Sequence, residues 1–277
     1  MRPLRRTLVA RLAILLTVIF SPASNAGERF ITLASTTSTE QSGLFDHLLP
    51  VFERQTGIAV RVVAVGTGQA LKVGMQGDAD ALLVHDRPGE DHFLAEGYGI
   101  DRRDVMYNDF VLIGPASDPA GIKGLTDAAE AFRRIAAAKA PFASRGDDSG
   151  THRGELRQWK AAGIDVKATG SGWYRELGSG MGPTLNAAAA MGAYVFSDRA
   201  TWANFNNRQG LVILAQGDKT LMNPYGSILV DPAKLSPAKA ADAKIWHEWL
   251  TGQPGRAAIA AYRINGEQLF FPSEAGR

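Results

Sequence analysis

Three turns of the sequence are rich in hydroxyl side chains and glycine, and each precedes a segment with helical spacing. They are Ser35-Thr36-Thr37-Ser38-Thr39, Val65-Gly66-Thr67-Gly68-Gln69 and Ser144-Arg145-Gly146-Asp147-Asp148-Ser149-Gly150-Thr151. Free backbone N–H groups and the helix dipole favour negative charge at a helix N-terminus. Hydroxyl groups add further donors, and glycine lets the backbone approach a ligand closely. The chemistry that these turns support is the binding of an anion.

Each turn taken alone is also explained as an ordinary helix cap, with Asp147 or Asp148 capping the third helix. Arg145 makes the third turn different, because a guanidinium group presents a fork of donors that fits a tetrahedral oxyanion. The second turn lacks both the third glycine of a dinucleotide fingerprint and the lysine of a nucleotide P-loop. The combination therefore favours an oxyanion site over a nucleotide site.

Ser149, His152 and two neighbouring aspartates also have the composition of a nucleophilic catalytic site. His152 lies in the first turn of the predicted helix, however, and the sequence offers no acid to orient its far side. His85 and Asp86 follow the same predicted strand and could reach the cleft, but they are interpreted as part of a polar loop. There is no cysteine, and the five histidines show no HExxH pattern, so no zinc site is predicted. We expect a binding protein without a cofactor rather than an enzyme.

The elements that position these turns alternate between strands and helices. Strands are predicted over residues 30–34, 59–65, 81–84, 111–114, 142–144, 193–196, 211–214 and 225–230. Helices are predicted over residues 43–55, 69–75, 93–96, 126–138, 151–161, 184–191, 201–206, 237–251 and 255–261. Such alternation predicts an α/β fold with parallel sheets covered by helices on both faces. Ligands of such sheets bind where strand C-termini meet helix N-termini, which is where the three turns lie.

Two segments, near residues 109–114 and 223–225, are expected to carry the chain between two lobes. They predict a first lobe built from residues 27–111 and 224–277 and a second lobe built from residues 112–223. Two α/β lobes joined by a two-strand hinge would enclose a ligand cleft between them.

The first 26 residues have the pattern of a secretory signal peptide. Four arginines precede a short apolar run over residues 12–20, and Ser24-Asn25-Ala26 offers a cleavage site. The apolar run is shorter than the roughly 20 residues that span a bilayer. Removing this segment takes four arginines from 30 basic residues and leaves 26 against 28 acidic residues, a net charge near −2. The mature chain is therefore expected to be a soluble periplasmic monomer that does not bind nucleic acid.

The chain resembles the tungstate-binding proteins of bacterial ABC uptake systems. The matching stretches are residues 35–39 (STTST), 63–71 (VAVGTGQAL), 104–111 (DVMYNDFV), 144–152 (SRGDDSGTH) and 266–271 (GEQLFF). The third turn also resembles the Arg-x-Asp-x-Ser-Gly-Thr turn of phosphate-binding proteins, which are more distant relatives. One departure is Ser35, where the family usually has threonine; a hydroxyl group is retained.

The resemblance implies a type II periplasmic binding fold that captures tungstate or molybdate and delivers it to a membrane permease. It implies ligand contacts from Thr36, Thr37, Thr67, Gly68, Arg145, Ser149, Gly150 and Thr151. Tungstate, molybdate and sulfate are full dianions that need only donors, whereas monohydrogen phosphate also needs an acceptor, which Asp147 or Asp148 could supply. The choice of tungstate rests on the resemblance alone. The alternatives are a phosphate receptor and an anion-handling transferase on the same fold.

Overall fold

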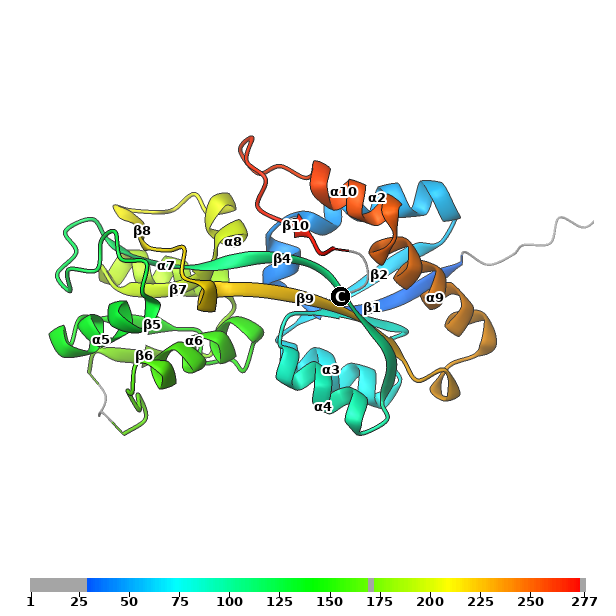
Figure 1. Ribbon diagram of the computed structural model, residues 1–277, viewed down its shortest axis with the longest axis horizontal. Coiled ribbons are helices and arrows are strands. Elements are labelled where there is room, and N and C mark those ends of the chain that lie inside the picture. Colours follow the sequence, from blue (N-terminus) through cyan, green and yellow to red (C-terminus); the bar gives the residue numbers. More distant parts are fainter. Residues whose placement is uncertain (1–28, 169–171, 275–277) are drawn as a thin grey trace, which may run out of the picture.

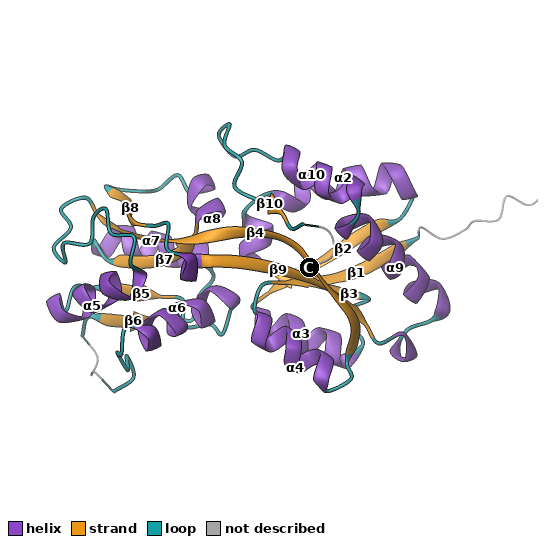
Figure 2. Ribbon diagram, viewed as in Figure 1, coloured by secondary structure: helices purple, strands orange, loops and turns teal. Residues whose placement is uncertain are grey.

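The computed structural model describes residues 29–168 and 172–274 (Figure 1). The predicted signal peptide, residues 1–26, lies outside the described residues. Within the described ranges, no helix has the length and apolar character needed to cross a membrane. The elements form two lobes, joined by two long strands that run side by side through the middle of the molecule (Figure 2).

The first lobe has a core of three parallel strands with helices on both faces. Strand β1 (Phe30–Thr36) pairs with β2 (Ala59–Val65) on one side and with β3 (Ala81–Val84) on the other. The helices are α1 (Thr37–Gln41), α2 (Leu44–Thr56), α3 (Thr67–Gln76), α4 (Arg87–Ala95), α9 (Pro237–Thr251) and α10 (Gln253–Ala261). Ile31 and Leu33 face α2, α9 and α10, whereas Ala34 faces α3 and α4. Both faces of the sheet are buried, which explains the continuous apolar runs of these strands.

The second lobe is organised in the same way around β5 (Phe142–Ser144). This strand is parallel to β6 (Tyr174–Glu176) and to β7 (Tyr194–Asp198). The remaining elements are α5 (Ala128–Ala138), α6 (Gly150–Ala161), α7 (Met181–Met191), α8 (Arg199–Asn204) and β8 (Leu211–Ala215). Phe142 packs on the side of α5 and α6, and Ala143 packs on the side of α7, so this sheet is also covered on both faces.

The two lobes are joined by β4 (Gly99–Pro115) and β9 (Met222–Val230), which are antiparallel to each other. Strand β9 continues the first sheet through β3, and the far end of β4 pairs antiparallel with β7 and β8. The expectation of parallel sheets is confirmed for β1 to β3 and for β5 to β7. Both sheets are nevertheless mixed, because β4 and β9 run antiparallel to the strands with which they pair. The short strand predicted over residues 111–114 is the end of a 17-residue strand.

Shorter elements complete the chain. They are the 3₁₀ turns η1 (Lys219–Leu221) and η2 (Pro232–Lys234) and strand β10 (Phe271–Pro272), which pairs with β4. Helix α9 is capped by Ser236, whose hydroxyl accepts a hydrogen bond from the backbone N–H of Lys239 at 3.3 Å. The aromatic side chains of Trp246, Trp249 and Phe270 are buried in the core of the first lobe.

Candidate anion-binding site

The three predicted turns form the N-termini of α1, α3 and α6, and these helices begin next to one another across the junction of the lobes. The backbone N–H of Gly150 donates to the hydroxyl of Thr67 at 2.8 Å. Arg145 Nη2 donates to the hydroxyl of Thr37 at 3.2 Å. A methyl group on Gly68 would collide with the carboxylate of Asp148. The lobes are therefore in direct contact at the turns.

We use the name donor cluster for the eight residues that the sequence predicted as ligand contacts. Thr36, Thr37, Thr67 and Gly68 come from the first lobe, and Arg145, Ser149, Gly150 and Thr151 come from the second. Seven of the eight are buried, and Thr37 is partly exposed. The structure brings the two halves of this set to one junction.

The third turn is capped by Ser149, and not by an aspartate as the sequence predicted. The hydroxyl of Ser149 accepts from the backbone N–H of His152 at 3.2 Å, and Asp147 Oδ1 accepts from the backbone N–H of Ser149 at 3.2 Å. Asp148 is mostly exposed, and its carboxylate pairs with Arg153 at 2.8 Å. The aspartates therefore brace the turn that leads into α6.

Arg145 contacts Asp147 and Thr37, and its Nη1 atom has no hydrogen-bond partner among the described residues. Its Nε and Nη2 atoms donate to Asp147 Oδ2 at 3.1 and 2.6 Å. Within the described part of the chain, Arg145 Nη1 and the hydroxyl of Thr151 are buried and have no hydrogen-bond partner. A buried polar group without a partner costs about 1–3 kcal/mol. An oxyanion at the N-terminus of α6 would satisfy both of these donors.

His85 belongs to this junction, which corrects its interpretation as part of a polar loop. Its side chain follows β3, is 2% exposed, and has Nε2 at 3.2 Å from the hydroxyls of both Thr36 and Ser38. Its Nδ1 lies 2.9 Å from Asn223 Oδ1 on β9. Burial lowers the pKa of His85 to about 4, so the ring is neutral near pH 7. The position of His85 at a strand C-terminus was the signal that could have found it.

Asp86 is also buried and joins the two lobes, which corrects its interpretation as a loop residue. One carboxylate oxygen accepts from Arg153 Nη1 at 2.7 Å, and the other accepts from Arg157 Nη1 at 2.8 Å. Both arginines lie on α6 of the second lobe, whereas Asp86 precedes α4 of the first. We call Asp86, Arg153 and Arg157 the clasp. Its long sequence separations explain why the pattern of the chain did not reveal it.

The geometry around His152 does not form a nucleophile and a base. His152 Nδ1 accepts from the backbone N–H of Asp148 at 3.1 Å, while Nε2 lies 3.6 Å from Glu176, too far for a hydrogen bond. The hydroxyl of Ser149 is occupied as a helix cap. Across residues 29–168 and 172–274 there is also no group of three side chains able to hold a metal ion. These contacts suit binding better than catalysis.

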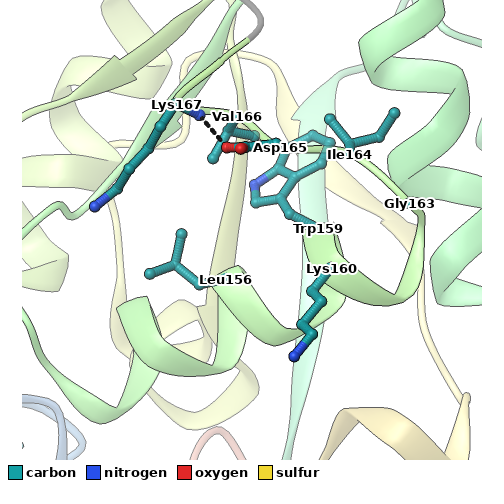
Figure 3. A pocket seen from close by; sticks show the side chains of 8 residues that line it. All are labelled: Leu156, Trp159, Lys160, Gly163, Ile164, Asp165, Val166 and Lys167. Atoms are coloured by element: carbon teal, nitrogen blue, oxygen red, sulfur yellow. Dashed lines mark hydrogen bonds between the residues drawn. The ribbon is translucent and has the colours of Figure 1, made fainter.

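A separate pocket of about 400 Å³ lies at the C-terminal end of α6, far along the helix from the donor cluster (Figure 3). It is lined by Leu156, Trp159, Lys160 and residues 163–167, and Asp165 Oδ1 accepts from the backbone N–H of Lys167 at 3.0 Å at its rim. The Asp165 carboxylate already accepts a hydrogen bond, and much of the pocket lining is apolar. This pocket therefore does not have the character of an anion site.

Two α/β lobes with a buried set of donors between them define a solute-binding protein of the periplasmic type. The model of the PBP superfamily domain matches residues 21–253. The tungstate-binding protein TupA of Peptoclostridium acidaminophilum is 43% identical over 280 residues, which cover 97% of each chain. This chain therefore belongs to the PBP superfamily and, within it, to the family of the tungstate-binding proteins.

Solved structures agree with this assignment. The crystal structure of the tungstate ABC transporter from Geobacter sulfurreducens is similar with a TM-score of 0.78 and 47% identity, covering 85% of this chain and 99% of that one. The tungstate-binding protein TupA from Desulfovibrio alaskensis G20 has a TM-score of 0.75 and 43% identity, covering 88% of this chain and 99% of that one. The first is described as a tungstate ABC transporter and the second as a tungstate-binding protein.

Proposed function

We propose that the protein captures tungstate, or the nearly isosteric molybdate, and delivers it to the membrane permease of an ABC transporter. The observation that carries this proposal is the pair of buried, unpartnered donors at the start of α6, Arg145 Nη1 and the hydroxyl of Thr151. Donors in this state favour a ligand that only accepts hydrogen bonds. The names of the relatives favour tungstate as that ligand.

The existing hydrogen bonds and ion pairs of Asp147 and Asp148 favour a full dianion over monohydrogen phosphate as the ligand. Asp147 Oδ2 already accepts two hydrogen bonds from Arg145, and Asp148 is paired with Arg153 at the surface. Neither is left to accept the proton of a hydrogen phosphate. The phosphate alternative would depend on Asp198, whose Oδ2 is buried and has no partner among the described residues.

We further propose that the ligand is bound by the eight residues of the donor cluster and is enclosed by closure of the lobes. The lobe boundaries expected from the sequence, 27–111 with 224–277 and 112–223, fall within β4 and β9, where two paired strands can act as a hinge. Because both lobes contribute donors, the ligand should favour the closed arrangement.

The remaining expectations complete the proposal. The mature protein would begin after cleavage near Ala26, reside in the periplasm, act as a monomer, need no cofactor, and release its ligand unchanged. Elemental analysis of dialysed protein tests the cofactor expectation, and a stoichiometric zinc or iron content would contradict it.

Calorimetric titration of the mature chain with tungstate, molybdate, sulfate and phosphate tests the function directly. We expect one tungstate or molybdate per chain and much weaker binding of phosphate. Tighter binding of phosphate, accompanied by loss of that binding in Asp198→Asn, would establish the phosphate alternative instead. Absence of binding by all four anions would reject the proposed function.

A further inference from the structure

His85 connects the donor cluster to the hinge through a continuous chain of side-chain hydrogen bonds. Asn108 on β4 and Asn223 on β9 are directly opposite each other in the pairing of the two hinge strands. Asn223 Nδ2 donates to Asn108 Oδ1 at 2.7 Å, and Asn223 Oδ1 lies 2.9 Å from His85 Nδ1. The other ring nitrogen contacts Thr36 and Ser38. A cross-strand pair in the hinge therefore reaches the first anion turn through one imidazole.

The same contacts determine which ring nitrogen carries the proton. Because the amide nitrogen of Asn223 is used toward Asn108, its oxygen faces His85, and this oxygen can only accept. His85 Nδ1 must therefore donate. Since burial keeps the ring neutral, Nε2 has a free lone pair and accepts a hydroxyl proton from Thr36 or Ser38.

The ring has little freedom to leave this position. It stacks on Tyr225 with centroids 4.8 Å apart and an interplanar angle of 29°. From the other lobe, Gly150 approaches so closely that a methyl group there would lie 2.8 Å from His85 Cε1. Both lobes and the hinge strand β9 therefore hold the imidazole in one orientation.

We infer that His85 is a positioning residue of the anion site, holding the hydroxyls of Thr36 and Ser38 in one arrangement and tying it to the hinge pair Asn108 and Asn223. The inference rests on the proposed function and deepens it. Hydroxyl groups rotate freely unless a neighbour fixes them, and each has a single proton to donate. The Thr36 and Ser38 hydroxyls lie 3.1 Å apart, so when one donates to Nε2 the other keeps its proton for the anion. A donor held in this way loses less entropy when the ligand arrives. The hydroxyl arrangement would thereby depend on the state of the hinge.

Two substitutions separate the two halves of this role. In His85→Gln the side-chain oxygen reaches the position of Nε2 and can still accept from Thr36 and Ser38. In His85→Asn the shorter side chain reaches the position of Nδ1 and keeps only the contact with Asn223. We expect His85→Asn to raise the Kd for tungstate at least about tenfold, the effect of losing about 1.4 kcal/mol. His85→Gln should stay within about threefold of the wild type.

A matched control is His247→Phe, which removes another buried imidazole that contacts a serine hydroxyl, with His247 Nδ1 at 2.8 Å from Ser227. It should lower the melting temperature without changing the Kd. Equal losses of affinity in both His85 variants, with melting temperatures lowered as in this control, would assign His85 a packing role and overturn the inference. Wild-type affinity in both variants would also overturn it.

Nitrogen-15 NMR of the ligand-free wild-type protein tests the tautomer without any ligand. We expect His85 to carry its proton on Nδ1 at pH 7, and a proton on Nε2 would overturn the inference. Failure of the proposed function is distinguishable, because the wild type would then bind neither tungstate nor molybdate whatever tautomer the spectrum reports.

Discussion

The lobes meet at two polar contacts, which differ in whether all of their polar atoms have hydrogen-bond partners. In the donor cluster, Arg145 Nη1 and the hydroxyl of Thr151 are buried without a partner in the described chain. In the clasp, each carboxylate oxygen of Asp86 accepts from its own arginine on α6. The donor cluster therefore has buried donors without acceptors, whereas in the clasp both carboxylate oxygens are hydrogen-bonded.

Because of this difference, we expect the two contacts to contribute to lobe closure in different ways. A complete ion pair favours the closed arrangement whether or not a ligand is present. Uncommitted donors favour closure only when an anion supplies the acceptors, because without it they lose the water that hydrates them in the open arrangement. Affinity for the ligand should therefore contain two separable contributions, from contacts with the anion and from closure itself.

The largest effect is expected at Arg145, which belongs to the first contribution. Arg145→Ala removes one or two charge-assisted hydrogen bonds of about 1.5–3 kcal/mol each, so the Kd for tungstate should rise at least about tenfold. Arg145→Lys should recover only part of the loss, since an ammonium group cannot form the fork. Calorimetry measures both. Unchanged affinity with a lowered melting point would mean that Arg145 only braces Asp147.

Gly150→Ala tests closure without removing a donor. The added methyl group would lie 2.8 Å from the His85 ring and 2.9 Å from the Thr67 hydroxyl, contacts that exist only when the lobes are together. We expect up to about a tenfold rise in Kd and less compaction on adding tungstate, measured by small-angle scattering. Gly172→Ala has open space around it and serves as the control. Wild-type compaction in Gly150→Ala would contradict the assigned contact.

Asp86→Asn tests whether the ion pairs of the clasp or the negative charge of Asp86 has the larger effect on anion binding. Removing a buried negative charge near an anion site should by itself strengthen anion binding, whereas weakening the clasp should weaken it. We expect the second effect to prevail, with a Kd raised a few-fold and less in high salt, which screens the wild-type pair. Asp91→Asn disrupts an exposed pair with Arg87 and is the control. A lower Kd in Asp86→Asn would show that the clasp does not assist binding.

The smallest effect on binding is expected for a charge buried inside one lobe. Glu155 accepts from Trp159 Nε1 and from the hydroxyl of Tyr174, and burial raises its pKa to about 7. The folded protein thus holds this proton more tightly than the unfolded chain, and stability should fall as pH rises from about 4.5 to 7. Glu155→Gln should remove this loss and raise the melting temperature at pH 8 but not at pH 4. Its Kd for tungstate should change by less than about threefold.

Much of the fold was predictable because local patterns agree with it. The strands over residues 59–65, 81–84 and 142–144 and the helix over 237–251 have the predicted bounds. The first half of β4 was not predicted, because charged residues such as Arg102 interrupt its apolar pattern. The side chain of Arg102 is nevertheless largely buried. Its Nε donates to Glu90 of α4 at 2.9 Å. A partner in another element makes a charged residue acceptable inside a sheet, and sequence periodicity does not contain that information.

The three turns that contain the donor cluster were recognisable in the sequence for a related reason. Hydroxyls, glycine and Arg145 occur within continuous turns, so their chemistry is visible before folding. His85 and Asp86 acquire their roles from residues far along the chain, including Asn223 at 138 positions from His85 and Arg157 at 71 positions from Asp86. Contacts of this kind arise only when the two lobes are assembled.

Strand β4 passes through the interior of both lobes. Val105 and Met106 lie in the hydrophobic core beside α2 and α9, and a few residues later Phe110 and Leu112 lie in the core beside α5 and α6. Ala200, on α8 of the second lobe, also lies in the first of these cores, so the two lobes share buried contacts as well as strands. We therefore expect the two lobes to unfold together, even if they move relative to each other at the proposed hinge.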